Sequence, residues 1–384
     1  MIPLSVPNIS GKEWEYVKEC LDTEWVSSAG KYVDKFESDV AKYVNSKYAV
    51  ACTNGTSAFH VSLRLVGVEA NTEVIVPSLT FIAPVNAIVY NNASPVFMDV
   101  DEYYNIDIVK TIDFIKNETQ YKNGHSYNKI TKKRISALLP VHMWGNAVDL
   151  EDLMIICQER NIPVVEDSSE SLGTSYIKNK YKGQYTGTIG KVGCLSFNGN
   201  KIITTGGGGM ILTGDGKLAE KAKYLTTQAK DDPVRYIHND IGYNFRLTNV
   251  QAAIGVAQLK QLKKFLKRKK DIYNFYKTQV EKIDGLTIAD VPPFSNNNHW
   301  MTLLQINEKI YGMNREELMK KLTEHGIQSR PAWAPIHKLK PYKDFQNFKI
   351  NNTQILVNKS LCIPSSTNIK LSEKEIIISA LKNQ

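Results

Sequence analysis

One lysine in this chain stands where covalent chemistry is possible. Lys201 is followed by two threonines and four glycines, within a segment (195–210) that has apolar residues at both ends. A lysine amine can form a Schiff base with a carbonyl group, and burial beside Phe197 and Ile202 would favour its neutral, nucleophilic form. The glycines would let backbone approach a ligand closely. The segment therefore predicts a nucleophilic lysine.

An aspartate could complete that chemistry. Asp167 ends the apolar run 162–167, which reads as a buried strand. Ligands of open α/β sheets bind at the carboxyl ends of the strands. A carboxylate placed there can keep a pyridine nitrogen protonated, which makes the ring an electron sink. An N-cap for the next turn is the alternative role. Lys201 and Asp167 together predict the cofactor pyridoxal 5'-phosphate (PLP), with pyridoxamine 5'-phosphate as its second form.

Other strand ends carry residues that suit such a cofactor. Gly55 and Thr56 join a strand to a helix, and the N–H groups at a helix N-terminus form an anion site. Ser196, just before Lys201, could add a hydroxyl to this phosphate cup. Phe81 follows another strand and could stack on a pyridine ring. The alternatives are an ordinary strand-to-helix turn for the first pair and core packing for Phe81.

Several other classes of site are not supported. His142 follows a strand, but nothing pairs it with cysteine or aspartate at metal-ligand spacing, so a structural role is expected and no metal site is predicted. The glycines 206–209 do not form a P-loop, and no Gly-x-Ser-x-Gly is present. The five scattered cysteines favour a reducing, cytoplasmic compartment over a disulfide scaffold.

The bulk properties limit the partners. The 384 residues and 42% hydrophobic content fit a large domain and a smaller one. The net charge of +9 favours anionic partners, but no nucleic-acid-binding signature accompanies it, and the lysines of 260–270 read as the solvated face of a helix. No stretch is apolar enough to span a membrane, and the first residues lack the features of a signal peptide. We therefore expect no nucleic-acid or membrane partner.

The elements that must position these side chains alternate along the first part of the chain. Strands are predicted at 47–52, 74–77, 95–99, 135–140 and 162–166, with helices at 11–22, 53–65, 82–91, 107–117 and 149–160. This alternation is typical of βαβ units and predicts an α/β fold with a mostly parallel sheet. We expect a large domain at 1–250 and a small α/β domain at 251–384.

Local signals add detail. Ser10 with Glu13, and Asn314 with Glu317, match the capping-box pattern that opens a helix. A strand is predicted at 300–306 and a last helix at 372–382. The polar, lysine-rich stretch 117–134 reads as a surface insertion that interrupts the βαβ rhythm.

Taken together, the motifs resemble the DegT/DnrJ/StrS family of PLP-dependent sugar aminotransferases, which have the aspartate-aminotransferase fold (fold type I). The similarity runs along nearly the whole chain. Its motifs are Trp25–Gly30, Thr53–Ala58, Pro77–Phe81, Pro140–His142, Glu166-Asp167, Ser196-Phe197, Lys201, Thr204–Gly206, Gly242–Arg246, Arg330 and Pro335–His337.

The resemblance implies a role for each matching position. Lys201 would carry the cofactor and shuttle the proton, Asp167 would pair with the ring nitrogen, and Phe81 would stack on the ring. The phosphate would be held by Gly55, Thr56 and Ser196, and by Asn244 of a second subunit, so a homodimer with shared active sites is expected. Ser27, Ser28, Arg330 and His337 would face a nucleotide-sugar.

Two positions depart from the family pattern. Glu170 stands where glutamine or histidine often contacts the phenolic oxygen of the cofactor, and a carboxylate there is repulsive unless a proton is shared. Gly207 replaces a usual glutamate. This form of the motif is most similar to GDP-perosamine synthases and to the aminotransferases of legionaminic acid pathways. Sugar 3-dehydratases of this fold have histidine in place of the lysine, so Lys201 argues against that reaction.

The sequence thus predicts an aminotransferase that moves the amino group of L-glutamate to C4 of a nucleotide-linked 4-keto-6-deoxy hexose, in the biosynthesis of a surface glycan. Amination at C3 would use the same cofactor residues and is one alternative. A PLP-binding protein without catalytic activity is another, and a nucleic-acid-binding module is a third.

Overall fold

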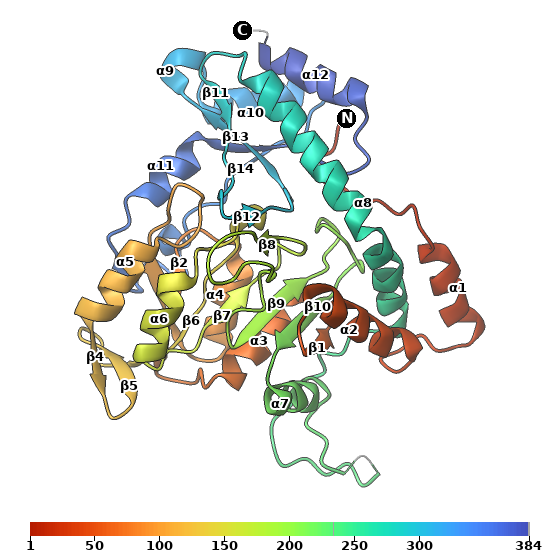
Figure 1. Ribbon diagram of the computed structural model, residues 1–384, viewed down its shortest axis with the longest axis vertical. Coiled ribbons are helices and arrows are strands. Elements are labelled where there is room, and N and C mark those ends of the chain that lie inside the picture. The colour runs from red at the N-terminus through yellow and green to blue at the C-terminus, as the bar shows by residue number, and fades with distance from the viewer. Residues whose placement is uncertain (233, 383–384) are drawn as a thin grey trace.

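A twisted sheet (the large sheet) forms the centre of the lower part of the molecule in Figure 1. The structure is a computed structural model that describes residues 1–232 and 234–382. The strands lie in the order β1-β10-β9-β7-β6-β2-β3, and β7 meets β6 through two isolated parallel bridges. Their bounds are β1 (Tyr48–Cys52), β2 (Thr72–Pro77), β3 (Ser94–Met98), β6 (Arg134–Leu138), β7 (Val165–Asp167), β9 (Val192–Ser196) and β10 (Gly209–Thr213). Among these strands β10 alone runs antiparallel to its neighbours, so the mostly parallel sheet is confirmed.

Helices cover both faces of the large sheet, as burial of a parallel sheet requires. Side chains alternate between the faces: Val74 and Val76 belong to one core, and Ile75 belongs to another. The first core includes residues of α3 (Gly55–Leu65), α4 (Ile82–Tyr90) and α7 (Gly216–Thr226). The opposite face packs against α5 (Ile108–Asp113), α6 (Glu151–Glu159), α2 (Lys31–Val44) and the first half of α8 (Asn249–Val280), with α1 (Glu13–Asp22) on α8.

A second, smaller sheet lies above the first in Figure 1. It is antiparallel, in the order β11-β13-β16-β14, and comprises β11 (Leu286–Ile288), β13 (Thr302–Ile306), β14 (Arg330–Pro331) and β16 (Ser360–Ile363). Around it lie α9 (Glu308–Tyr311), α10 (Arg315–Glu324), α11 (Asn352–Lys359) and α12 (Leu371–Lys382).

The helix α8 connects the two sheets. Its first half packs in the core beside the large sheet, and its last turns pack in the core of the small sheet. At the other end of the chain, Ile2 pairs with Ile327 and joins that second core. The division of the chain at residues 250 and 251 stays a prediction.

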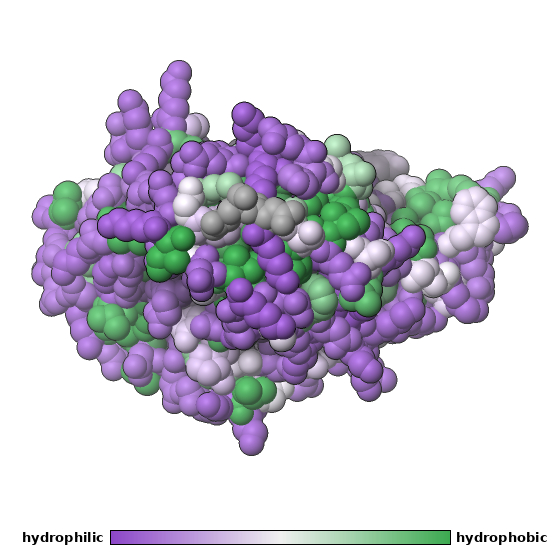
Figure 2. Space-filling model, turned by 90° about the horizontal axis from the view of Figure 1, so that it is seen from above, coloured by the Kyte–Doolittle hydropathy of each residue, from purple (hydrophilic) through white to green (hydrophobic). Residues whose placement is uncertain are grey.

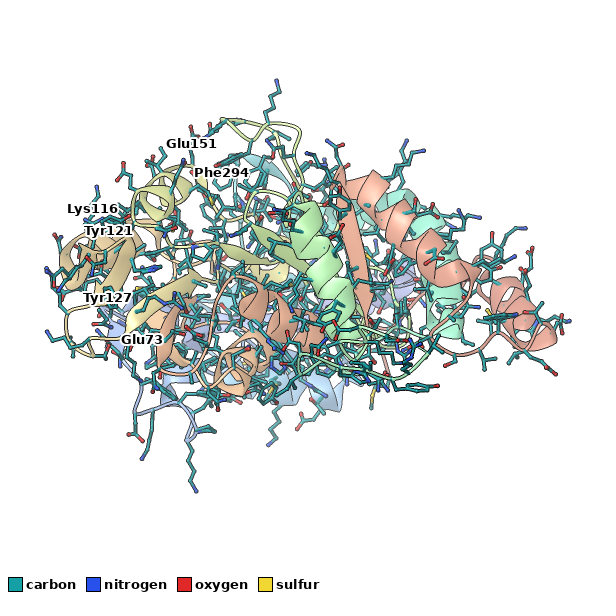
Figure 3. The ribbon with its side chains drawn as sticks, turned by 90° about the horizontal axis from the view of Figure 1, so that it is seen from below. Glu73, Lys116, Tyr121, Tyr127, Glu151 and Phe294 are labelled. Carbon is teal, nitrogen blue, oxygen red and sulfur yellow. The ribbon has the colours of Figure 1, made fainter. Side chains whose placement is uncertain are left out.

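The predicted insertion is an ordered extension of the large sheet. A π-helix (Phe114–Glu118) leads into the hairpin of β4 (Thr119–Lys122) and β5 (His125–Asn128), which pairs with β6 through Tyr127 and Arg134. Tyr121, Tyr127, Lys116 and Glu73 lie at the same end of the molecule in Figure 3. The buried Asn128 amide donates to the Glu73 carboxylate at 2.7 Å, which ties the hairpin to β2. The hairpin stands between α5 and β6 and so interrupts the βαβ alternation, as predicted, but its pairing with the sheet was not foreseen.

The capping predictions have opposite outcomes. Asn314 and Glu317 form a complete capping box at the start of α10, as predicted. Ser10 does not cap α1: the helix begins at Glu13 and its N-cap, Lys12, makes no side-chain cap. The Glu13 carboxylate instead accepts hydrogen bonds from Gln258 and Gln261 of α8. A tertiary contact thus replaces the local one.

The remaining elements are short: β8 (Ser175–Tyr176), β12 (Ser295–Asn296), β15 (Asn347–Phe348), and the 3-10 turns Met143–Gly145 and Ile336–Lys338. Seen from the small-sheet side, the surface is mostly hydrophilic, with apolar side chains in separate patches (Figure 2). None of the helices within the described residues is long and apolar enough to cross a membrane.

Candidate active site

A cavity of about 730 Å³ opens where β1, β7 and β9 end and where the small sheet meets the large one. Eight of the residues singled out from the sequence line it: Gly55, Thr56, Phe81, Asp167, Glu170, Ser196, Lys201 and Arg330. They come from segments far apart in the chain. The parallel strands β7 and β9 are neighbours, so residues at their carboxyl ends reach the same edge of the sheet.

The floor of the cavity carries a buried carboxylate. Asp167 is the last residue of β7 and is only 4% exposed. Burial raises its pKa above the ordinary value, because a charged carboxylate loses solvation there. The backbone N–H of Ser169 donates to its Oδ1 at 2.9 Å and fixes the carboxylate. A cationic ring nitrogen placed above Asp167 would supply the compensating charge.

Lys201 lies in the same cavity with its amine between a carboxylate and an aromatic face. Its Nζ is 3.4 Å from Oε1 of Glu170 and 4.1 Å from the centre of the Trp300 ring. The Lys201 side chain is 12% exposed. The lysine side chain is therefore partly desolvated. Its backbone lies in a tight turn after β9, in which the backbone N–H of Lys201 donates to the carbonyl of Asn198.

Glu170 is a buried acid that binds its proton more tightly than an exposed glutamate does. Burial raises its pKa to about 7; Asp167 adds to that rise, and Lys201 opposes it. The backbone N–H of Trp144 donates to its Oε2 at 2.8 Å. A proton held here at neutral pH turns Glu170 into a hydrogen-bond donor, which removes the repulsion that a carboxylate would exert on a phenolate.

The start of α3 forms a cradle suited to a phosphate. Asn54 caps the helix by accepting from Ser57 N–H, and the first N–H groups of a helix have no partner within it. A Cβ at Gly55 would lie 3.1 Å from the Cβ of Ser196, so a larger residue there would push Ser196 away by a few tenths of an ångström. The Ser169 hydroxyl lies 3.7 Å from that same point; it forms no hydrogen bond of normal geometry among the described residues, although its interaction with the Asp167 carboxylate helps to lower the pKa of that group.

These donors fit the group that the sequence predicts. An amine, two buried acids, a helix N-terminus and an orphaned hydroxyl occupy one cavity, which matches the aldehyde, ring nitrogen, phenolic oxygen and phosphate of PLP. No cluster of three or more metal-ligating side chains occurs among the described residues.

Aromatic side chains form the upper wall, and sequence reasoning missed most of them. Phe81 is 52% exposed at the start of α4 and meets Trp333 edge-on, with the ring centres 5.4 Å apart. Trp333 also contacts Trp144 at 5.7 Å. Trp144 closely follows the Pro140–His142 motif, and Trp333 closely precedes the Pro335–His337 motif. Their position beside these motifs was the one sign in the sequence that they could belong to the site. Trp300 and Ser169 carried no such signal.

Four predicted residues lie outside the cavity of this single chain. Ser27 and Ser28 belong to the loop before α2, where the carbonyl of Ser27 accepts from Asn249 N–H. Asn244 is exposed on the strand-like return of the 228–246 loop. His337 is hydrogen-bonded to Ser78 at 2.5 Å, and burial lowers its pKa. Their roles stay predictions.

Both ring nitrogens of His142 are hydrogen-bonded inside the protein. Its Nδ1 accepts from the N–H of Val148 at 3.0 Å, so Nε2 carries the proton and donates to Glu166 at 2.9 Å. The side chain is fully buried, which supports the structural role expected of it.

Comparisons with known proteins agree with this geometry. Residues 7–382 match the DegT/DnrJ/EryC1/StrS aminotransferase family. A GDP-perosamine synthase of Escherichia coli O157:H7 is 38% identical over 344 residues, covering 89% of this chain and 87% of the relative. Another, from Caulobacter vibrioides, is 34% identical over 382 residues, covering 99% and 97%.

A solved structure shows the same architecture. The crystal structure of DesI in the presence of its TDP-sugar product has a TM-score of 0.88 to this chain at 25% identity, and the match covers 99% of this chain and 92% of that one. The predicted fold type I architecture is confirmed by this likeness.

Proposed function

The chain belongs to the DegT/DnrJ/EryC1/StrS aminotransferase family, and from that premise we propose that it moves the amino group of L-glutamate to C4 of a nucleotide-linked 4-keto-6-deoxy hexose. It is an enzyme, and PLP is its cofactor. The observation that carries the proposal is the meeting of Lys201, Glu170 and Asp167 in one cavity beside the start of α3. When bound, PLP supplies a carbonyl carbon that accepts amines and a ring that delocalises negative charge.

The residues of the cavity would then have separate tasks. Lys201 would be the nucleophile and, from a position that is partly shielded from water, its Nζ would accept and return a proton. Asp167 keeps the ring nitrogen protonated by ion pairing in a buried site. Glu170 donates a hydrogen bond to the phenolic oxygen while it holds its proton.

The phosphate would be held by neutral donors. Gly55 and Thr56 offer N–H groups at the positive end of α3, and Ser196 and Ser169 offer hydroxyls. Phe81 would stack on the pyridine ring of the cofactor from the open side of the cavity.

The substrates would enter from the exposed end of the cavity. Arg330 lies there with its guanidinium accessible, and a guanidinium suits both the carboxylates of L-glutamate and a pyrophosphate. The 4-amino product class is supported by the two GDP-perosamine synthase relatives, and the nucleotide link by DesI, whose structure contains a TDP-sugar.

We further propose a homodimer in the cytoplasm. The loop segments 228–232 and 234–246 extend away from the rest of the chain (Figure 1) and expose Tyr236 and Ile241, which suits contact with a second copy. Asn244 on this loop would reach the phosphate in the partner's cavity. Sedimentation of the purified protein as a monomer at micromolar concentration would contradict this part of the proposal.

The reaction is tested with purified protein, L-glutamate and GDP- or UDP-linked 4-keto-6-deoxy hexoses. We expect the absorbance of the cofactor to change with L-glutamate alone and to return on addition of the keto-sugar. NMR of the product should place nitrogen on C4. Nitrogen on C3 would overturn the regiochemistry, and no spectral change with any amino donor would overturn the reaction.

A further inference from the structure

Within the described part of the chain, Trp300 is the aromatic residue whose ring faces the Lys201 amine. The Nζ atom lies 4.1 Å from the ring centre, within the range of a cation–π interaction. On another side, Glu170 approaches the amine at 3.4 Å. The amine therefore has one neighbour that can accept its proton and one that cannot.

Trp300 is anchored by one hydrogen bond of its ring and two of its backbone. Trp300 is 1% exposed, and its ring N–H donates to the carbonyl of Asn200 at 2.7 Å, in the turn that carries the lysine. Its backbone N–H donates to Asn298, and its carbonyl accepts at 2.7 Å from the buried amine of Lys269 on α8. The backbone bonds fix the position of residue 300, and the indole cannot rotate away from Lys201 without breaking its hydrogen bond to Asn200.

We propose that Trp300 is a positioning residue that holds the Lys201 amine in place when this amine is not covalently engaged and carries the proton that it transfers. The inference rests on the proposed function, in which the lysine is released from the cofactor and must stay beside the reacting carbon. An indole face attracts the charged amine without taking its proton, so the proton stays available for transfer. A carboxylate alone would compete for that proton.

Other charged groups also face the amine. Glu170 and Asp167 lie in the same cavity wall, and Arg330 lies at its exposed end. The test must therefore change Trp300 while these three residues stay intact.

The test uses full-length protein freed of PLP. Wild type, Trp300→Leu and Trp300→Phe are reductively methylated with formaldehyde and cyanoborohydride across a range of pH, and labelling at Lys201 is quantified by peptide mass spectrometry. Exposed Lys263 in the same digest is the internal control.

Loss of the aromatic face should destabilise the ammonium form. We expect the labelling profile of Lys201 in Trp300→Leu to move to lower pH, so that labelling on the rising limb increases about 5- to 30-fold. Trp300→Phe keeps an aromatic ring that attracts the ammonium more weakly, so its labelling profile should lie between those of wild type and Trp300→Leu. If Trp300→Leu does not fold, the comparison of Trp300→Phe with wild type tests the proposal. Lys263 should not change. A uniform increase at every pH would mean better access only and would overturn the proposal, as would superimposed profiles.

A second readout separates this proposal from the proposed function. In single-turnover reaction of the PLP-loaded protein with L-glutamate, Trp300→Leu should be slower and Trp300→Phe should recover part of the rate. If wild type itself does not react with L-glutamate, the proposed function fails while the labelling result still decides whether Trp300 holds the amine.

Discussion

The cofactor end and the substrate end of the cavity are built by different means. At the cofactor end, Asp167 and Ser196 stand at the ends of adjacent strands and Gly55 at the start of a helix, with Asp167 buried. At the substrate end, Arg330 is exposed. A group that takes part in every step benefits from fixed, desolvated contacts. Substrates that enter and leave in turn need accessible contacts, so the two ends should respond differently to mutation.

The largest effect is expected at Lys201. Lys201→Ala removes the nucleophile and the proton carrier together, and we expect kcat to fall by at least about 10² to 10⁴-fold. Steady-state assays with L-glutamate and the keto-sugar measure this, with Lys263→Ala on the exposed face of α8 as control. Many turnovers by Lys201→Ala would show that the cofactor end does not depend on this amine.

Ser169→Ala tests the phosphate cradle. The orphaned hydroxyl should donate to an anionic phosphate, and a hydrogen bond to a charged group contributes about 1.5–3 kcal/mol. We expect affinity for PLP to fall about 10-fold or more, while affinity for pyridoxal, which lacks the phosphate, stays unchanged. Fluorescence titration of cofactor-free protein measures both. Ser168→Ala, another buried orphaned hydroxyl, is the matched control outside the cavity lining. Equal losses for both ligands would contradict the assignment.

Arg330→Ala probes the substrate end. Because this guanidinium is exposed, its ion pairs are weakened by solvent, and we expect KM for a substrate to rise only about 3- to 5-fold with little change in kcat. Initial-rate kinetics with each substrate varied in turn would show which one it contacts. A large fall in kcat with unchanged KM would place Arg330 at the cofactor end instead.

The smallest effect concerns stability and pH. The pKa of Glu170 is raised from 4.5 to about 7 in the folded chain, so between these values the folded state holds a proton that the unfolded state has lost. The free energy of unfolding therefore falls as pH rises through this window. In Glu170→Gln this contribution is absent. We expect cofactor-free Glu170→Gln to melt a few degrees above wild type at pH 8 and close to it at pH 4.5, by calorimetry. An equal offset at both pH values would contradict the pKa shift.

The sequence was most informative where a signal is local and no tertiary contact competes with it. The exposed Asn314–Glu317 box formed as predicted, and within the described residues no competing contact of these two side chains is seen. The same pattern at Ser10 failed because α8 supplies two glutamine donors to Glu13. The hairpin within 117–134 was not foreseen, because the polar composition of this stretch gave no sign of the pairing between Tyr127 and Arg134.

Residue types and order along the chain were enough to predict the mostly parallel sheet and to single out Lys201, Asp167, Gly55 and Ser196 as residues of one cavity. Strand ends carry that information, since parallel strands bring their carboxyl ends to one edge. The surroundings of the reactive amine were not predictable. Trp300 lies 100 residues from Asn200 in the chain, and Ser169 looks like any serine in a turn. Only packing of the two sheets decides which side chains are desolvated together, because burial and contact depend on the whole fold.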